Sequence, residues 1–172
     1  MISIRDTKRG LMAREEAGAG VQGAYAILFA YIIAMVGEIG TDRALDILSK
    51  VVEKRGRADG KRLIRKLGVS SGGIEAGLVV YGAFLDEWGA MHNVVEKTEG
   101  GVLVRVERCP LYEAFHSAEI NCDWMVEEIC RRLTLPLSSA VIKQVNPSLR
   151  VGIRKFRVSN DDYCLEELSS GT

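Results

Sequence analysis

The spacing of the apolar residues changes once along this chain, and that change limits the folds the chain can adopt. Between Ile74 and Leu85 apolar side chains recur at intervals of three and four, which is the repeat of an amphipathic helix. From Val102 to Arg108 they alternate with polar ones, which indicates a strand with one buried face. The 172 residues therefore predict a single α+β domain, with a helical part (1–89) and a sheet-forming, cysteine-bearing part (90–168).

The helical part is predicted to hold a loosely held leader over residues 1–12, followed by three helices. The first helix covers about 14–38 and the third about 74–88. The helix between them contains Gly56 and Gly60, which we expect to bend or break it, because glycine is a poor helix former.

An uncharged stretch over residues 17–37 raises the question of a membrane span. Glycines dilute this stretch, and its strongly apolar part, 24–36, is too short to cross a bilayer comfortably. We therefore expect no membrane insertion. A helix that is apolar on all sides is instead buried in a core or in a dimer interface, so the sequence favours a homodimer.

The second part is predicted to form a β-β-α-β-β antiparallel sheet with helices packed on one face. Its first two strands are joined by a turn at Gly100-Gly101, which is typical of a hairpin. Pro136 is expected to close the helical segment that begins at Asn121. The expected elements are strands at 92–98 and 102–108, helices from Pro110 to His116 and from Asn121 to Leu133, strand candidates at 141–145 and 151–158, and a last strand at 163–168.

The charge balance excludes some classes of partner. Lys and Arg together number 23, as do Asp and Glu, whereas a dedicated nucleic-acid-binding protein normally carries a basic excess. One local excess lies between Lys50 and Lys66. It either docks a phosphate or acidic partner or is simply a solvated helical face, and no aromatic residue interleaves the run to stack on a base.

The chain has four cysteines but no C-x-x-C pair: Cys109, Cys122, Cys130 and Cys164. No apolar signal segment stands at the N-terminus. We therefore expect a reducing, cytoplasmic setting, in which the cysteines are thiols or metal ligands before they are disulfides.

Three of the cysteines are candidates for one site. If the last hairpin pairs beside the first, the sulfurs of Cys109, Cys130 and Cys164 converge at one end of the sheet, where thiolates suit zinc or iron. His116 follows Cys109 by two helical turns. The alternative, which is favoured for Cys122, is that each cysteine is a small buried apolar residue.

Four short motifs in the second part resemble the family of L-2-amino-thiazoline-4-carboxylic acid hydrolases. They are Arg108-Cys109-Pro110, Ile129-Cys130, Asn146-Pro147 and Asn160-Asp161-Asp162-Tyr163-Cys164. The resemblance covers residues 90–168. Asn160 stands where the family usually has glycine, but asparagine also tolerates the turn. The element order is similar as well to the four-vinyl-reductase type of ligand-binding domain, found in regulators and Golgi transport proteins.

The resemblance implies a hydrolase that opens a cyclic amidine at a non-peptide C–N bond. Such a reaction needs an activated water or nucleophile, a proton donor and a cation for the substrate carboxylate. A metal on Cys109, Cys130 and Cys164 would activate water. In the alternative, a Cys109 thiolate of lowered pKa attacks, helped by His116. Arg105 and Arg154 are the candidates for holding the carboxylate.

Two other functions remain open from the sequence. One is a non-catalytic regulatory domain that binds a small molecule or a metal and signals through a partner. The other is a structural domain in which the cysteines only pack.

Overall fold

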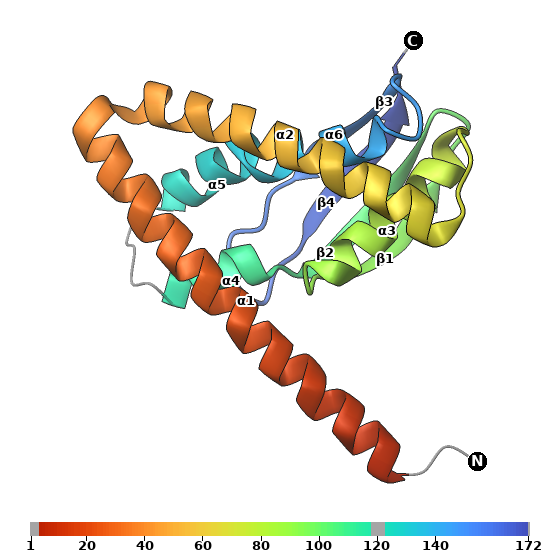
Figure 1. Cartoon of the computed structure of the whole chain (residues 1–172), viewed down its shortest axis with the longest axis horizontal. Coiled ribbons are helices and arrows are strands. Elements are labelled where there is room, and N and C mark those ends of the chain that lie inside the picture. Colours follow the sequence, from red (N-terminus) through yellow and green to blue (C-terminus); the bar gives the residue numbers. More distant parts are fainter. Residues whose placement is uncertain (1–3, 118–122, 172) are drawn as a thin grey trace.

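The computed structural model describes residues 4–117 and 123–171, with the side chains of residues 4–19, 22, 123 and 124 left out. Figure 1 shows its helices and strands. In chain order they are α1 (Ile4–Ile39), α2 (Thr41–Leu67), α3 (Ile74–Glu87), β1 (Met91–Lys97), β2 (Gly101–Arg108), α4 (Pro110–Ser117), α5 (Asp123–Arg132), α6 (Thr134–Ile142), β3 (Leu149–Lys155) and β4 (Cys164–Ser170).

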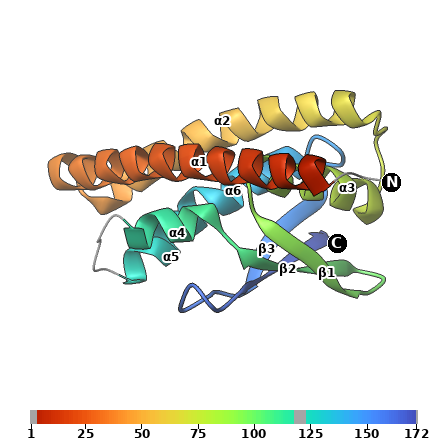
Figure 2. The ribbon, with the colours of Figure 1, turned by 90° about the horizontal axis from the view of Figure 1, so that it is seen from below.

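The sheet has four antiparallel strands in the order β1-β2-β4-β3. Figure 2 shows the helices on one side of this sheet and no helix on the other. The α+β class is therefore confirmed, as are the helix at α3 and the hairpin of β1 and β2. Since the closing strand β4 lies between β2 and β3, the second strand of the first hairpin and the last strand of the chain meet at the centre of the sheet.

Helix α1 is longer than expected. It begins at Ile4, so the prediction of a loose leader over residues 1–12 is wrong. It ends before Gly40, whose φ of 82° is a left-handed conformation that glycine adopts without strain. Tyr25, Phe29 and Ile32 are buried at helical spacing. They pack with α4 and α5 in a second core beside the main one over the sheet.

Helix α2 runs without a break from Thr41 to Leu67, so the expected bend at Gly56 and Gly60 is wrong. These glycines are where α6 comes closest. A Cβ at Gly56 would lie 2.5 Å from the carbonyl oxygen of Leu137, and one at Gly60 would lie 2.5 Å from that of Val141. Missing side chains allow the two backbones to touch, which offsets the poor helix propensity of glycine.

The strand expected at 141–145 is also wrong. Residues 134–142 form α6, and Pro136 lies in its first turn, a position that suits proline because the amide N–H groups there lack partners within the helix. Val141 and Ile142 are fully buried. A helix buried on several sides and a buried strand show the same run of apolar residues, and the run alone does not distinguish them.

The basic run on α2 is largely a solvated face. Arg55 and Arg62 contact Asp59, Arg57 contacts Glu53, and Lys66 joins Arg62 on Glu87 of α3. These four basic residues are thus paired with carboxylates of the same chain. The pairing favours a solvated helical face over a docking site for a phosphate or acidic partner.

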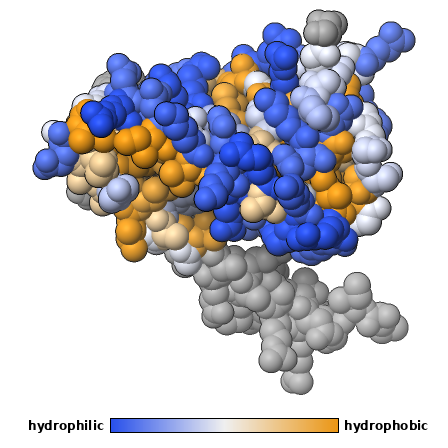
Figure 3. All heavy atoms as spheres, turned by 45° about the horizontal axis from the view of Figure 1, so that its top comes forward, coloured by the Kyte–Doolittle hydropathy of each residue, from blue (hydrophilic) through white to orange (hydrophobic). Residues whose placement is uncertain are grey.

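Apolar side chains also reach the surface. Figure 3 shows them gathered where α1 meets α2, and Ile27, Tyr31 and Val51 are among the exposed ones on these helices. No described helix is both long and apolar enough to cross a membrane. The homodimer stays a prediction.

We predict that Gly56→Ala and Gly60→Ala each lower the free energy of unfolding by about 2 kcal/mol, because overpacking against a fixed backbone costs about 1–3 kcal/mol. Urea unfolding measures this. The matched control is Gly37→Ala in α1, where a Cβ would meet nothing within 4 Å. That variant should be neutral or more stable. Equal effects at all three glycines would contradict the close approach.

Candidate functional site at the end of the sheet

Cys109 and Cys164 lie at the same end of the sheet because of the pairing between β2 and β4. Cys164 opens β4 and stands opposite Val106 of β2, and Cys109 directly follows β2. Along β4 the buried residues alternate: Cys164 and Glu166 face the helices together with Val104 and Val106 of β2. The register therefore points a thiol and a carboxyl group into the interior.

The thiols of Cys109, Cys130 and Cys164 are free, and the charge on one would affect the pKa of the others. Although residue Cys109 is partly exposed as a whole, its thiol is enclosed by protein, and burial raises its pKa to about 11. Burial also raises the pKa of Cys130 and of Cys164. All three thiols are therefore neutral at pH 7, and the thiolate of lowered pKa considered for Cys109 is not what this environment favours.

Glu166 is the buried acid of this region, and sequence reasoning missed it. Its residue is 5% exposed, and the hydroxyl of the fully buried Tyr81 donates a hydrogen bond to its Oε2. Burial raises the pKa of Glu166, while the bond from Tyr81 opposes the rise. The sequence did contain a signal that Glu166 is buried: it lies on β4 in alternation with Cys164 and Leu168, whose side chains point inward.

Arg157, in the loop between β3 and β4, was missed as well. It is 1% exposed, and its Nη2 donates to the carbonyl oxygens of Val106 at 3.0 Å and Glu107 at 2.5 Å. Its guanidinium carbon lies 5.2 Å from the centroid of the Tyr112 ring. The backbone N–H and the positive charge of Arg157 lower the pKa of Cys164, in opposition to burial.

We call Cys109, Cys130, Cys164, Glu166 and Arg157 the sheet-end site. Helix α6 adds two hydroxyls next to it. The Thr134 hydroxyl lowers the pKa of Cys130, and the Ser138 hydroxyl lowers the pKa of Tyr81, each in opposition to burial. The site thus joins neutral thiols, a buried carboxyl group and one cation in the interior.

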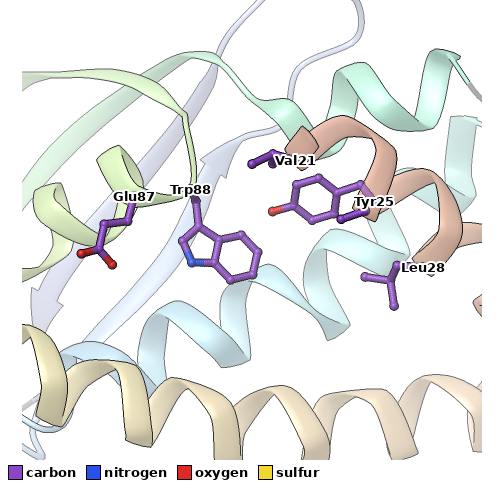
Figure 4. Close-up of a pocket in the computed structure, with 6 residues that line it drawn as sticks. Val21, Tyr25, Leu28, Glu87 and Trp88 are labelled. Carbon is purple, nitrogen blue, oxygen red and sulfur yellow. The ribbon is translucent and has the colours of Figure 1, made fainter. Parts of the chain in front are cut away.

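A pocket of about 330 Å³ lies beside this site, between α1 and the end of α3. Figure 4 shows its lining residues, with the Tyr25 hydroxyl directed toward the Trp88 indole. The two ring centroids are 5.8 Å apart. Burial raises the pKa of Tyr25, and Cys109 and Cys130 raise it further. Tyr25 therefore lines the pocket and also lies near the thiols. The lining residues are Val21, Ala24, Tyr25, Leu28, Glu87 and Trp88.

His116 does not have the place that its spacing from Cys109 suggested. Its side chain is exposed on α4, and its ring lies 4.5 Å from that of Tyr112 and 6.2 Å from that of Phe115. Apart from burial, the strongest effects on the pKa of Cys109 come from Tyr112, Cys164 and Glu166. The helper role of His116 stays a prediction.

Arg105 and Arg154 lie on the other face of the sheet. Arg105 stands between the buried Val104 and Val106, and its guanidinium is 4.0 Å from the centroid of the Tyr163 ring. Arg154 pairs with Glu167 at 2.7 Å. Because neighbouring side chains of a strand point to opposite faces, neither arginine points toward the thiols. Their substrate-binding role stays a prediction, but the structure separates it from the cysteines.

The arrangement and the protonation of the thiols bear on whether Cys109, Cys130 and Cys164 can bind a metal ion. Over residues 4–117 and 123–171, no group of three or more His, Cys, Asp or Glu side chains is placed to hold a metal ion. The buried thiols also favour their neutral form, whereas metals bind thiolates. The role as zinc or iron ligands stays a prediction, and Cys122 lies outside the described residues.

A helix-covered antiparallel sheet with an interior polar site at one end defines this chain as an α+β protein. The chain belongs to the family of L-2-amino-thiazoline-4-carboxylic acid hydrolases, whose model matches residues 22–165. The resemblance inferred from residues 90–168 is thereby confirmed, and the match extends into the helical part.

The fold is also similar to a solved structure, that of a trafficking protein particle complex subunit 3 from Naegleria fowleri covalently bound to palmitic acid. The TM-score is 0.53 at 17% identity, over 87% of this chain and 96% of that one. At this identity the likeness establishes the fold alone. A comparison with curated proteins found no match.

We predict that Glu166→Gln gains stability relative to the wild type as the pH rises above about 4.5, the ordinary pKa of a glutamate. The folded-state pKa of Glu166 is raised, so the folded protein binds the proton more tightly and the wild type loses stability as that proton leaves. Urea unfolding at pH 4, 6 and 8 measures the difference. The same substitution at the exposed Glu96 is the control. A difference that does not change with pH would contradict a buried acid.

Proposed function

We propose that this protein is a hydrolase that opens a small cyclic amidine or amide at the sheet-end site. The observation that carries the proposal is Glu166, a buried carboxyl group whose raised pKa favours its protonated form, next to Cys109 and Cys164. Family membership supports the reaction class. Ring opening needs a proton for the departing ring nitrogen, and a carboxyl group whose protonated form is favoured by burial can supply it.

The same carboxyl group resolves the difficulty of a thiol with a pKa of about 11. As the Cys109 sulfur forms a bond to the C=N carbon, one oxygen of Glu166 gives its proton to the ring nitrogen and the other takes the thiol proton. No free thiolate is needed. Glu166 then passes the thiol proton to the same nitrogen as the ring C–N bond breaks, and the exocyclic amino group of the 2-amino-thiazoline forms a C=N⁺ bond to the sulfur-bound carbon. Water attacks that carbon and returns one proton to Glu166, and Cys109 leaves as a thiol with the other as the carbon becomes a carbonyl. In the alternative, water takes the place of the thiol in the first step with the same proton relay.

We predict that the full chain opens the ring of 2-amino-thiazoline-4-carboxylate, followed as release of the product's primary amine, and that Glu166→Gln lowers kcat by about 10²–10⁴, the usual contribution of a general acid. Cys109→Ser decides the route: a comparable loss indicates thiol attack, and retained activity indicates water. Arg131→Gln, at an exposed ion pair on α5, is the control. An active Glu166→Gln or an inactive wild type would refute the proposal.

A second candidate is the non-catalytic ligand-binding domain, and the pocket of Figure 4 favours it. Its volume of about 330 Å³ and its apolar and aromatic lining are typical of a small-molecule site. The solved structure with a similar fold carries palmitic acid. In this candidate function the pocket takes an apolar chain, and the sheet-end site contacts the polar end.

For this candidate we predict that palmitate changes the fluorescence of Trp88. The experiment uses a Trp124→Phe background, because the chain has two tryptophans. Leu28→Glu should abolish the change by placing a charge in the pocket lining. Val51→Glu, at an exposed apolar position of α2, is the matched control. A palmitate titration that leaves Trp88 unchanged, or a response that survives in Leu28→Glu, would exclude apolar-chain binding here.

A further inference from the structure

Arg157 differs from three arginines of the neighbouring strands by having no carboxylate partner among the residues that the structure describes. Arg105, Arg108 and Arg154 each pair at the surface with a glutamate. Arg157 is fully buried, and no ion pair found among the described residues includes it. Its Nε is likewise without a hydrogen-bond partner in that part of the chain.

A buried, unpaired cation is costly, because the interior does not replace the water around it. Arg157 receives only partial compensation. Two backbone carbonyl oxygens accept from its Nη2, its side chain also hydrogen-bonds to the Cys164 thiol, and the face of Tyr112 lies beneath its guanidinium carbon. These partners are dipoles and a quadrupole, so they leave the net charge in place. A buried polar group left in this state calls for a partner that arrives from outside.

The neighbouring groups do not supply that partner. Burial favours the neutral thiols of Cys109 and Cys164. It also favours the protonated form of Glu166, although the hydrogen bond from Tyr81 works against this. The sheet-end site therefore places the Arg157 cation beside groups whose neutral forms are favoured by burial, an arrangement complementary to a negatively charged ligand. Because Nη2 already donates to two carbonyl oxygens, the Nε–H of Arg157 is the donor left for a carboxylate oxygen, in a hydrogen bond strengthened by the charges of both groups.

We propose that Arg157 is the residue that recognises the carboxylate of a ligand in the sheet-end site, in place of Arg105 and Arg154 on the opposite face. The inference rests on the proposed function in one respect: that function supplies the cyclic amidine or amide ring that the ligand carries besides its carboxylate. Arg157 holds the carboxylate while the ring lies against Cys109 and Glu166. It is a specificity-determining residue and takes no part in proton transfer.

Binding to the full chain tests this independently of turnover. The probes are 2-amino-thiazoline-4-carboxylate and its uncharged 4-carboxamide, measured by calorimetry on the wild type, Arg157→Met, Arg157→Lys and Arg131→Gln. We expect the wild type and Arg131→Gln to bind the carboxylate at least about tenfold more tightly than the amide, as expected for charge-assisted hydrogen bonds. Arg157→Met should bind both equally. Arg157→Lys should keep the preference for the carboxylate over the amide but bind the carboxylate more weakly than the wild type. This variant provides the test if Arg157→Met does not fold.

Four results would overturn the proposal: equal binding of both probes to the wild type, no binding of either, a preference that survives in Arg157→Met, or a preference lost in Arg105→Gln or Arg154→Gln instead. Carboxylate-selective binding through Arg157 without ring opening would retain this inference and refute the hydrolase. A purely structural role of Arg157 would change stability and leave the ratio of the two affinities as it is.

Discussion

The pairing of β2 with β4 is the interaction on which the rest of this molecule depends. It joins the first hairpin to a strand more than fifty residues later, and its register sets Cys164 opposite Val106 and Glu166 opposite Val104. A register shifted by one residue would turn both polar side chains out to the bare face of the sheet. The same pairing brings the end of β2 to the loop that carries Arg157, so one set of backbone hydrogen bonds assembles the thiol, the acid and the cation.

Burial then decides the protonation of these groups. Thiols and a carboxyl group removed from water favour their neutral forms, whereas an arginine keeps its charge under all ordinary conditions. The interior of the sheet end is therefore suited to proton transfer without prior ionisation, and it differs from the reactive-thiolate sites that low-pKa cysteines form. Tyr25 and Trp88 bound this environment on the side of the pocket.

Much of the fold was readable from the sequence, because the repeats of α3 and β2 are regular and each has one buried face. Helix α6 could not be read from the sequence. Its residues Val141 and Ile142 are buried, so their apolar run does not show the spacing of a helix with one buried face. Glu166 and Arg157 were overlooked for a related reason. A charged residue in an alternating strand or a loop is normally solvated. Only the long-range packing of β4 against α3, and of Arg157 against Tyr112 of α4, reveals that these two are not.

The unbroken course of α2 limits how a ligand enters the interior. With Gly56 and Gly60 in contact with the α6 backbone, this helix contains no hinge, and a bend at those residues would separate the two helices that cover the sheet. The pocket is lined instead by residues of α1 and of the end of α3, and one of them, Tyr25, also lies near the sulfurs of Cys109 and Cys130. A ligand held in the pocket would therefore touch an aromatic ring that neighbours the thiols, without any change in the packing of α2 against α6.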